Sequence, residues 1–259
     1  MPMSGKLLLG TALLLVLAYA GICALLFFKQ RGLIYYPHAT RVTVEQTDYS
    51  LAHGGLTLRG WRLNPGKHRA VIYFGGNAER LESSREAFAR GFPDRTVYLV
   101  SYRGYGASEG EPSQDALFGD ALALYDEVAA RHPDAPIAVI GRSLGSGVAS
   151  YLASQRPVER LALVTPFDSL AAVAQSHYQA FPVRWLMRDG YDSTSYLPRY
   201  RGPLLVLRAG RDEVIPPAST NHLLAALPNK PKVIDFPSAG HNDISDDAGY
   251  AAALGDFLR

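Results

Sequence analysis

The sequence predicts an α/β fold in which a mostly parallel central sheet is covered by helices, with a small helical cap and one N-terminal transmembrane helix. Three observations lead to this prediction. Short apolar runs alternate with helical stretches from residue 71 to the C-terminus, which is typical of parallel sheets because their crossover connections are usually helices. A serine flanked by glycines directly follows one of these runs. An uncharged apolar stretch occupies residues 7–28.

The length and composition are those of one globular domain with an apolar segment attached. The chain has 259 residues, of which 47% are hydrophobic and 19% charged. Its formal net charge is only +2 and no run of Lys or Arg is present, so we expect no nucleic-acid partner. Cys23 is the single cysteine, which excludes a disulfide within the chain and a cysteine-based zinc site. We expect no metal site.

The predicted strands and helices follow one another along the chain. A hairpin comes first, with strands at 42–49 and 56–63 joined by His53-Gly54-Gly55. The further predicted strands are 71–74, 97–100, 137–140, 161–164, 204–207 and 233–236, and the predicted helices are 78–90, 115–131, 144–155, 219–227 and 246–258. Ligands of such sheets bind at the carboxyl ends of the strands.

Residues 1–31 are predicted to be a membrane anchor, and residues 32–259 the folded domain. The run 7–28 has 22 residues without a charge; it would form a helix of about 33 Å against a hydrocarbon core of about 30 Å. Cleavage as a signal peptide after Ala18-Tyr19-Ala20 is the alternative, although the apolar run continues beyond it. Lys6 lies on one side and Lys29 and Arg31 on the other, so the charges leave the orientation of this single-pass helix open.

Residues 167–203 interrupt the alternation. The segment is long and rich in aromatic residues, and it lies between two predicted strands. Long insertions of this kind often cover an active site, so we expect a small cap here; an ordinary helical excursion is the alternative.

Ser143 is the candidate nucleophile. It stands in Gly141-Arg142-Ser143-Leu144-Gly145, between the predicted strand 137–140 and the predicted helix 144–155. A G-x-S-x-G pentad in this strand–turn–helix setting is typical of a nucleophile elbow, where a sharp turn exposes the serine beside a helix N-terminus.

Asp212 and His241 are the candidate acid and base. A serine hydroxyl needs an oriented base to act as a nucleophile, and in elbow enzymes the acid and then the histidine follow the serine along the chain. Asp212 comes just after the strand 204–207 and His241 just after the strand 233–236. Asp168 and Asp243 are the alternatives for the acid, and Asn242 and Asp243 are expected to shape the histidine loop.

The oxyanion donors are expected on two loops. The backbone N–H of Leu144 follows the nucleophile, and the second N–H should come from the loop Phe74-Gly75-Gly76-Asn77-Ala78 after the strand 71–74.

Four motifs together identify a family resemblance. They are Phe74-Gly75-Gly76-Asn77-Ala78, Tyr102-Arg103-Gly104-Tyr105-Gly106-Ala107-Ser108, Gly141-Arg142-Ser143-Leu144-Gly145, and the pair Gly210-Arg211-Asp212-Glu213-Val214-Ile215-Pro216 with Gly240-His241-Asn242-Asp243. With them the chain resembles the membrane-anchored α/β-hydrolases, whose eukaryotic members include protein depalmitoylases and lysophospholipid lipases and whose bacterial members are mostly uncharacterised. The resemblance extends over nearly the whole chain, including Pro182-Val183-Arg184-Trp185-Leu186.

The chain departs from the family pattern at two positions. Gly75 stands where the family usually has His, and Ser101 where it usually has Asp before the Tyr-Arg-Gly-Tyr-Gly stretch. The resemblance still implies that the backbone N–H of Asn77 is the second oxyanion donor.

These residues predict a serine hydrolase of the esterase, lipase or thioesterase type that works without a cofactor. Ser143 would form an acyl-enzyme, which water activated by His241 would hydrolyse. The anchor and the aromatic cap favour an acylated or lipid-like substrate near a membrane. A peptidase of the same fold and a catalytically idle anchored scaffold are the alternatives.

Overall fold

The computed structural model describes the backbone of residues 3–259 and the side chains from Gly5 onward. Eight strands form one sheet in the order β1-β2-β4-β3-β5-β6-β7-β8. Their bounds are β1 Tyr49–His53, β2 Leu56–Leu63, β3 Arg69–Phe74, β4 Arg95–Val100, β5 Ile137–Arg142, β6 Leu161–Val164, β7 Leu204–Arg211 and β8 Lys232–Gly240. β1 and β2 are antiparallel, β2 meets β4 antiparallel, and every later pair is parallel. The predicted mostly parallel α/β sheet is thus confirmed.

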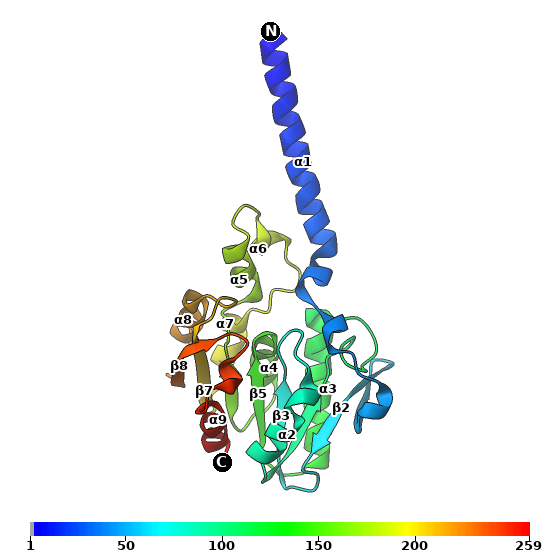
Figure 1. Cartoon of the computed structure of the whole chain (residues 1–259), viewed down its shortest axis with the longest axis vertical. Coiled ribbons are helices and arrows are strands. Elements are labelled where there is room, and N and C mark those ends of the chain that lie inside the picture. Colours follow the sequence, from blue (N-terminus) through cyan, green and yellow to red (C-terminus); the bar gives the residue numbers. More distant parts are fainter. Residues whose placement is uncertain (1–2) are drawn as a thin grey trace.

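Helices cover both faces of the sheet (Figure 1). Helices α3 Gln114–Arg131, α4 Leu144–Gln155 and α8 Pro217–Ala225 pack on one face, and α2 Leu81–Gly91 and α9 Tyr250–Leu258 on the other. Successive side chains of a strand point to opposite faces. On β3, Ile72 and Phe74 therefore join the first core while Val71 and Tyr73 join the second. Because both faces of the central strands are buried, these strands are continuous apolar runs.

The first strand of the hairpin was predicted too early, at 42–49. The structure has a 3-10 turn, η2 Val44–Gln46, in that stretch and begins β1 at Tyr49. Gly54 and Gly55 have φ of 60° and 76° and form the two-residue turn that pairs His53 with Leu56. A two-residue turn requires the first strand to end directly before it, which moves the strand toward the C-terminus of the predicted run.

Other boundaries differ from the predictions by a few residues. Ala78 has a positive φ of 60°, so α2 starts at Leu81 rather than at 78. The short helix η4 Ile244–Asp246 precedes α9, which therefore begins at Tyr250 rather than at 246. Both β7 and β8 extend past their apolar runs, to Arg211 and Gly240.

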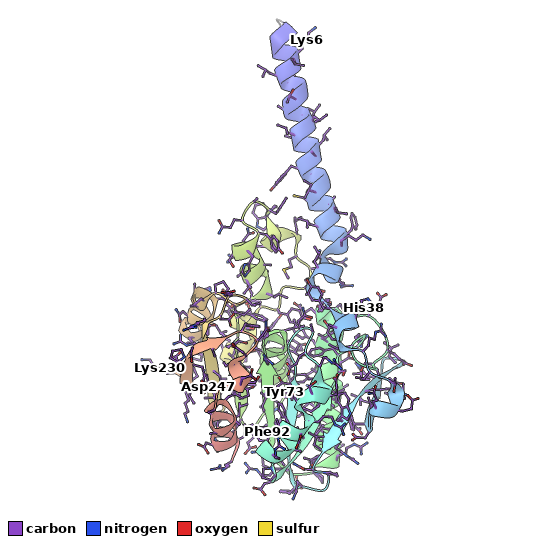
Figure 2. All side chains as sticks on the ribbon, in the orientation of Figure 1. Lys6, His38, Tyr73, Phe92, Lys230 and Asp247 are labelled. Carbon is purple, nitrogen blue, oxygen red and sulfur yellow. The ribbon has the colours of Figure 1, made fainter. Side chains whose placement is uncertain are left out.

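A long helix, α1 Met3–Ile34, projects from the sheet and is followed by the turn η1 Pro37–Thr40. Its most apolar window has a mean hydropathy of 2.5, and the helix is long and apolar enough to cross a membrane. In Figure 2, the N-terminal half of this helix, as far as Lys6, projects away from the described domain, and no other helix or strand lies beside its side chains. The division into an anchor of residues 1–31 and a domain of residues 32–259 stays a prediction.

The segment 167–203 is largely helical and lies between β6 and β7. It contains α5 Leu170–His177, α6 Val183–Leu186, α7 Ser193–Tyr196 and η3 Leu197–Arg199. Helices α5 and α6 stand above the carboxyl ends of the strands, beside the lower half of α1 (Figure 1). We call residues 167–190 the cap.

Candidate active site

Ser143 occupies a strained turn between β5 and α4. Its φ and ψ are 50° and −117°, a conformation that a residue with a side chain rarely adopts. The flanking glycines allow the turn to pack closely: a Cβ at Gly145 would lie 2.1 Å from the Phe74 carbonyl oxygen, and one at Gly141 would lie 2.4 Å from the Gly145 carbonyl oxygen. The local geometry is therefore that of a nucleophile elbow.

The three side chains predicted from the sequence meet in one hydrogen-bonded chain. His241 Nε2 lies 2.9 Å from Ser143 Oγ, and His241 Nδ1 lies 2.8 Å from Asp212 Oδ2. The three residues directly follow β5, β7 and β8, and the carboxyl ends of these parallel strands lie at one edge of the sheet, which brings the residues together.

Asp212 is fixed on its other side by the backbone. Its Oδ1 accepts hydrogen bonds from the N–H groups of Val214 at 2.9 Å and Ile215 at 2.7 Å. The side chains of His241 and Asp212 are only 8% and 5% exposed. The carboxylate can therefore orient the imidazole with little competition from water.

The two alternative acids have other partners. Asp168 accepts from Ser219 Oγ at 2.6 Å and lies 2.9 Å from His222 Nδ1, so it links the start of the cap to α8. Asp243 accepts from the N–H of Gly240 and shapes the loop that holds the histidine, as expected.

The loop after β3 lies beside the serine. A Cβ at Gly76 would lie 3.6 Å from Ser143 Cβ. Among residues 3–259, neither the N–H of Asn77 nor that of Leu144 has a protein acceptor, so both are free to donate to a ligand. Their assignment as oxyanion donors stays a prediction.

This loop is braced despite its glycines. Tyr102 donates to the carbonyl oxygen of Gly75 at 2.8 Å, which gives the Tyr-Arg-Gly-Tyr-Gly stretch a structural role. Leu81 occupies the space beside Gly75, because a Cβ there would lie 2.8 Å from Leu81 Cδ2. Leu81 and Tyr102 therefore hold the loop at the position where the family pattern usually has a histidine.

The structure contains a buried ion pair between Glu79 and Arg142 that the sequence did not predict, and it joins two loops of the site. Glu79 Oε2 accepts from the N–H of Gly76 at 2.6 Å, and Arg142 donates to the carbonyl oxygens of His241 and Asn242 at 3.3 and 3.0 Å. Burial alone would lower the pKa of Arg142, but the Glu79 carboxylate together with the hydroxyls of Tyr73 and Tyr250 outweighs burial, and the pKa is raised. The only signals of this pair in the sequence are the positions of its charges: Glu79 directly follows the expected oxyanion loop, and Arg142 lies inside the G-x-S-x-G pentad.

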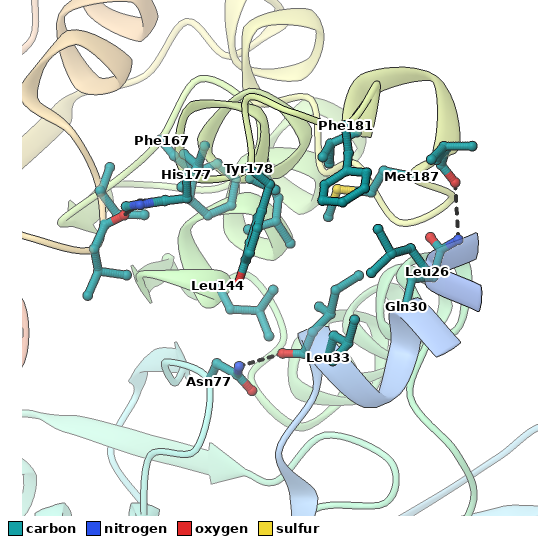
Figure 3. A pocket seen from close by; sticks show the side chains of 18 of the residues that line it. Leu26, Gln30, Leu33, Asn77, Leu144, Phe167, His177, Tyr178, Phe181 and Met187 are labelled. Carbon is teal, nitrogen blue, oxygen red and sulfur yellow. Dashed lines mark hydrogen bonds between the residues drawn. The ribbon is translucent and has the colours of Figure 1, made fainter. Parts of the chain in front are cut away.

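An apolar cavity of about 570 Å³ reaches the serine, a volume typical of small-ligand sites. It is lined by the cap, by the catalytic loops and by α1 (Figure 3). The contributions of α1 are Ile22, Leu26, Gln30, Leu33 and Ile34, and those of the cap include Phe167, Leu170, Val173, Ala174, Tyr178, Phe181 and Met187. No pattern in the sequence indicates that α1 forms a wall of the cavity.

Side-chain hydrogen bonds hold α1 against the site. Asn77 Nδ2 donates to the carbonyl oxygen of Ile34 at 2.6 Å, and Gln30 Nε2 donates to that of Leu186 at 3.1 Å (Figure 3). Arg31 Nε lies 3.2 Å from Asp189 Oδ2, a carboxylate only 4% exposed. The end of the apolar helix is therefore part of the active-site architecture.

The sheet topology and the strained turn at Ser143 are those of the α/β-hydrolase class. Residues 69–186 match the family described as alpha/beta hydrolase fold. An uncharacterized protein of Mycobacterium tuberculosis strain H37Rv is 34% identical over 89% of this chain and 86% of its own length. The chain belongs to the α/β-hydrolase family.

Two further comparisons cover different parts of the chain. Lysophosphatidylserine lipase ABHD12 of Mus musculus is 32% identical over 58% of this chain and 43% of its own length. The crystal structure of the Pyrococcus furiosus esterase Pf2001 is similar in fold, with a TM-score of 0.66, 19% identity, and coverage of 84% of this chain and 97% of that one.

Proposed function

We propose that the protein is a serine hydrolase that cleaves a carboxylic ester or thioester through an acyl-enzyme on Ser143. The hydrogen-bonded chain from Asp212 through His241 to Ser143 carries this proposal. His241 takes the Ser143 proton as Oγ attacks the acyl carbon, and Asp212 stabilises the imidazolium that forms. The N–H groups of Leu144 and Asn77 donate to the oxyanion.

The second half of the reaction restores the enzyme. The imidazolium gives its proton to the leaving alcohol or thiol as the carbon–oxygen or carbon–sulfur bond breaks. His241 then removes a proton from water, whose oxygen attacks the acyl carbon. Ser143 leaves with the returned proton, and the carboxylic acid is released.

The proposed substrate carries a long acyl chain. The cavity next to Ser143 is lined almost entirely by apolar side chains from the cap and α1, so burial of methylene groups would supply the binding energy. The similarity to a lysophosphatidylserine lipase makes single-chain phospholipids the first natural substrates to test.

We further propose that α1 is an uncleaved, single-pass membrane anchor. Its length and hydropathy support this. The hydroxyl of Tyr19 donates to the carbonyl oxygen of Ala180 in the cap at 2.9 Å, and cleavage after Ala20 would remove that contact.

A fluorophosphonate probe tests the nucleophile directly, because it reacts with an activated serine. The wild-type protein should be labelled and Ser143→Ala should not. Ser146→Ala is the matched control: its hydroxyl donates to the Ser143 carbonyl oxygen and not to the histidine, so labelling should persist. Equal labelling of wild type and Ser143→Ala would refute the proposal.

A further inference from the structure

The cap lies alongside the apolar part of α1 rather than below it. Tyr19 stacks on Phe181 with 5.8 Å between ring centroids and donates to the Ala180 carbonyl oxygen. Eleven residues further along α1, Gln30 donates to the carbonyl oxygen of Leu186. The cap therefore contacts α1 from the level of Tyr19 to that of Gln30.

These contacts restrict where a bilayer can lie. Tyr19 follows Lys6 by 13 residues, which is about 20 Å of helix at about 1.5 Å per residue. The hydrocarbon core is about 30 Å thick, so the part of α1 beyond the cap is too short to cross it. A bilayer that α1 crosses must extend past Tyr19 toward Phe28, and it then surrounds the end of the cap.

We propose that the tip of the cap, residues 178–188, is immersed in the lipid leaflet beside α1. This inference rests on the proposed spanning role of α1. The exposed surface of the tip would then contact the lipid of the leaflet that adjoins the folded domain.

The side chains of the tip fit that partner. Trp185 is 90% exposed and Tyr178 is 63% exposed, and aromatic residues with a polar atom are enriched at the level of the headgroups. Residues 178–188 include no acidic side chain.

The two arginines of the tip, Arg184 and Arg188, suit an anionic headgroup layer. The Arg188 guanidinium lies 5.7 Å from the centroid of the Phe27 ring, near the end of the apolar run, where its charge can reach the headgroups.

The immersed tip gives the cavity a direct route from the leaflet. Ile22 and Leu26 line the cavity and belong to the stretch of α1 that the bilayer must include. A single-chain lipid can then slide its acyl chain from the leaflet toward Ser143 without exposing it to water, which avoids the cost of hydrating each methylene group.

The fluorescence of Trp185 tests the proposal directly. The chain has two tryptophans, and the other, Trp61, is 1% exposed and buried in the sheet. The full-length protein is placed in phosphatidylcholine vesicles, with acyl chains either unmodified or brominated, and its emission is compared with that of Trp185→Phe. The difference between the two proteins belongs to Trp185, and the substitution is on an exposed side chain that the cavity does not use.

Brominated chains should remove most of the Trp185 emission, and aqueous iodide should have little effect on it. Quenching by iodide and not by brominated lipid would overturn the proposal, since the tip would then lie in water. Protection from both quenchers would also overturn it, in favour of a protein partner. Fluorophosphonate labelling in the same vesicles reports on the proposed catalytic function independently, so the two proposals fail separately.

Discussion

Arg142 and Glu79 form a buried ion pair, with 3.6 Å between Nη1 and Oε1 and only 14% and 12% of their side chains exposed. One partner binds the loop that holds His241 and the other binds the loop that holds Asn77. The pair therefore couples the base to the expected oxyanion loop, through side chains that make no hydrogen bond to the Ser143 hydroxyl.

Replacing Arg142 should impair the chemical step more than substrate binding. In Arg142→Gln the histidine loop loses its donors, and we expect kcat to fall by roughly 10- to 100-fold, the cost of small misplacements in an active site. KM should change little, and Arg142→Lys should recover part of the loss because it keeps the charge but not the planar fork.

The control for this variant is Arg156→Gln, which breaks a surface ion pair with Asp126 and should leave kcat unchanged. Steady-state kinetics and thermal unfolding of all three variants separate positioning from folding. An unchanged kcat in Arg142→Gln would contradict the positioning role.

Asp212→Asn should lower kcat by about 10⁴-fold, because an amide at this position favours the wrong tautomer of His241. Asp168→Asn is a matched control, since Asp168 also contacts a histidine, His222, but has no contact with His241. Rates of ester hydrolysis by the two purified variants show which aspartate is the catalytic acid. A larger loss of activity in Asp168→Asn than in Asp212→Asn would identify Asp168 as the acid.

Gly145→Ala should abolish hydrolysis and the yield of folded protein together. The added Cβ would lie 2.1 Å from the backbone oxygen of Phe74, a contact that only a shift of the elbow could relieve. Gly91→Ala is the control, because nothing lies within 4 Å of its Cβ position. Normal labelling of Gly145→Ala by a fluorophosphonate would show that the elbow tolerates the shift.

Activity should rise with acyl-chain length until the cavity is filled. Each buried methylene contributes about 0.8 kcal/mol, so each added CH₂ should raise kcat/KM by about fourfold. Ala174→Trp would fill part of the cavity and should reduce activity on long chains while sparing short ones. Ala252→Trp, on the exposed side of α9, should leave the series unchanged. A p-nitrophenyl ester series measures both, and a flat profile for the wild type would argue against a lipid-like substrate.

The sequence predicted the central sheet and the catalytic candidates because both depend on local patterns. The strands around Ser143 are buried on both faces and therefore read as uninterrupted apolar runs. Asp212 and His241 were predicted because each comes a few residues after such a run, and parallel strands of one sheet end at the same edge.

The features that were missed depend on contacts between distant residues. Nothing near Glu79 in the sequence shows that Arg142 lies beside it, and the apolar run of α1 is the same whether its end lines a cavity or stands free. The strand predicted at 42–49 was wrong because the glycine turn, not the apolar pattern, sets the register of β1 with β2.

A separate ion cluster away from the active site should make stability depend on pH. Arg95 and Arg69 lie 2.9 and 2.6 Å from the carboxylate of Glu159. Burial alone would raise the pKa of Glu159, but the hydrogen bonds from the two arginines outweigh it and lower the pKa below 4.5. Burial also lowers the pKa of Arg95, which starts so high that the guanidinium stays charged throughout the acidic range.

The direction of the effect follows from proton linkage. Because the unfolded chain binds the Glu159 proton at a higher pH than the folded protein does, the stabilisation is fully present above a pH of about 4.5 and is lost as the pH falls through the folded pKa. Glu159→Gln should therefore lower the free energy of unfolding by about 2 kcal/mol at neutral pH, and by less below pH 4.5, at the ordinary pKa of the side chain.

Chemical denaturation of both proteins across this pH range measures the difference, with Glu86→Gln as the control for an exposed ion pair that contributes little. A difference between wild type and Glu159→Gln that stays constant from neutral to acidic pH would show that the carboxylate charge does not stabilise the fold.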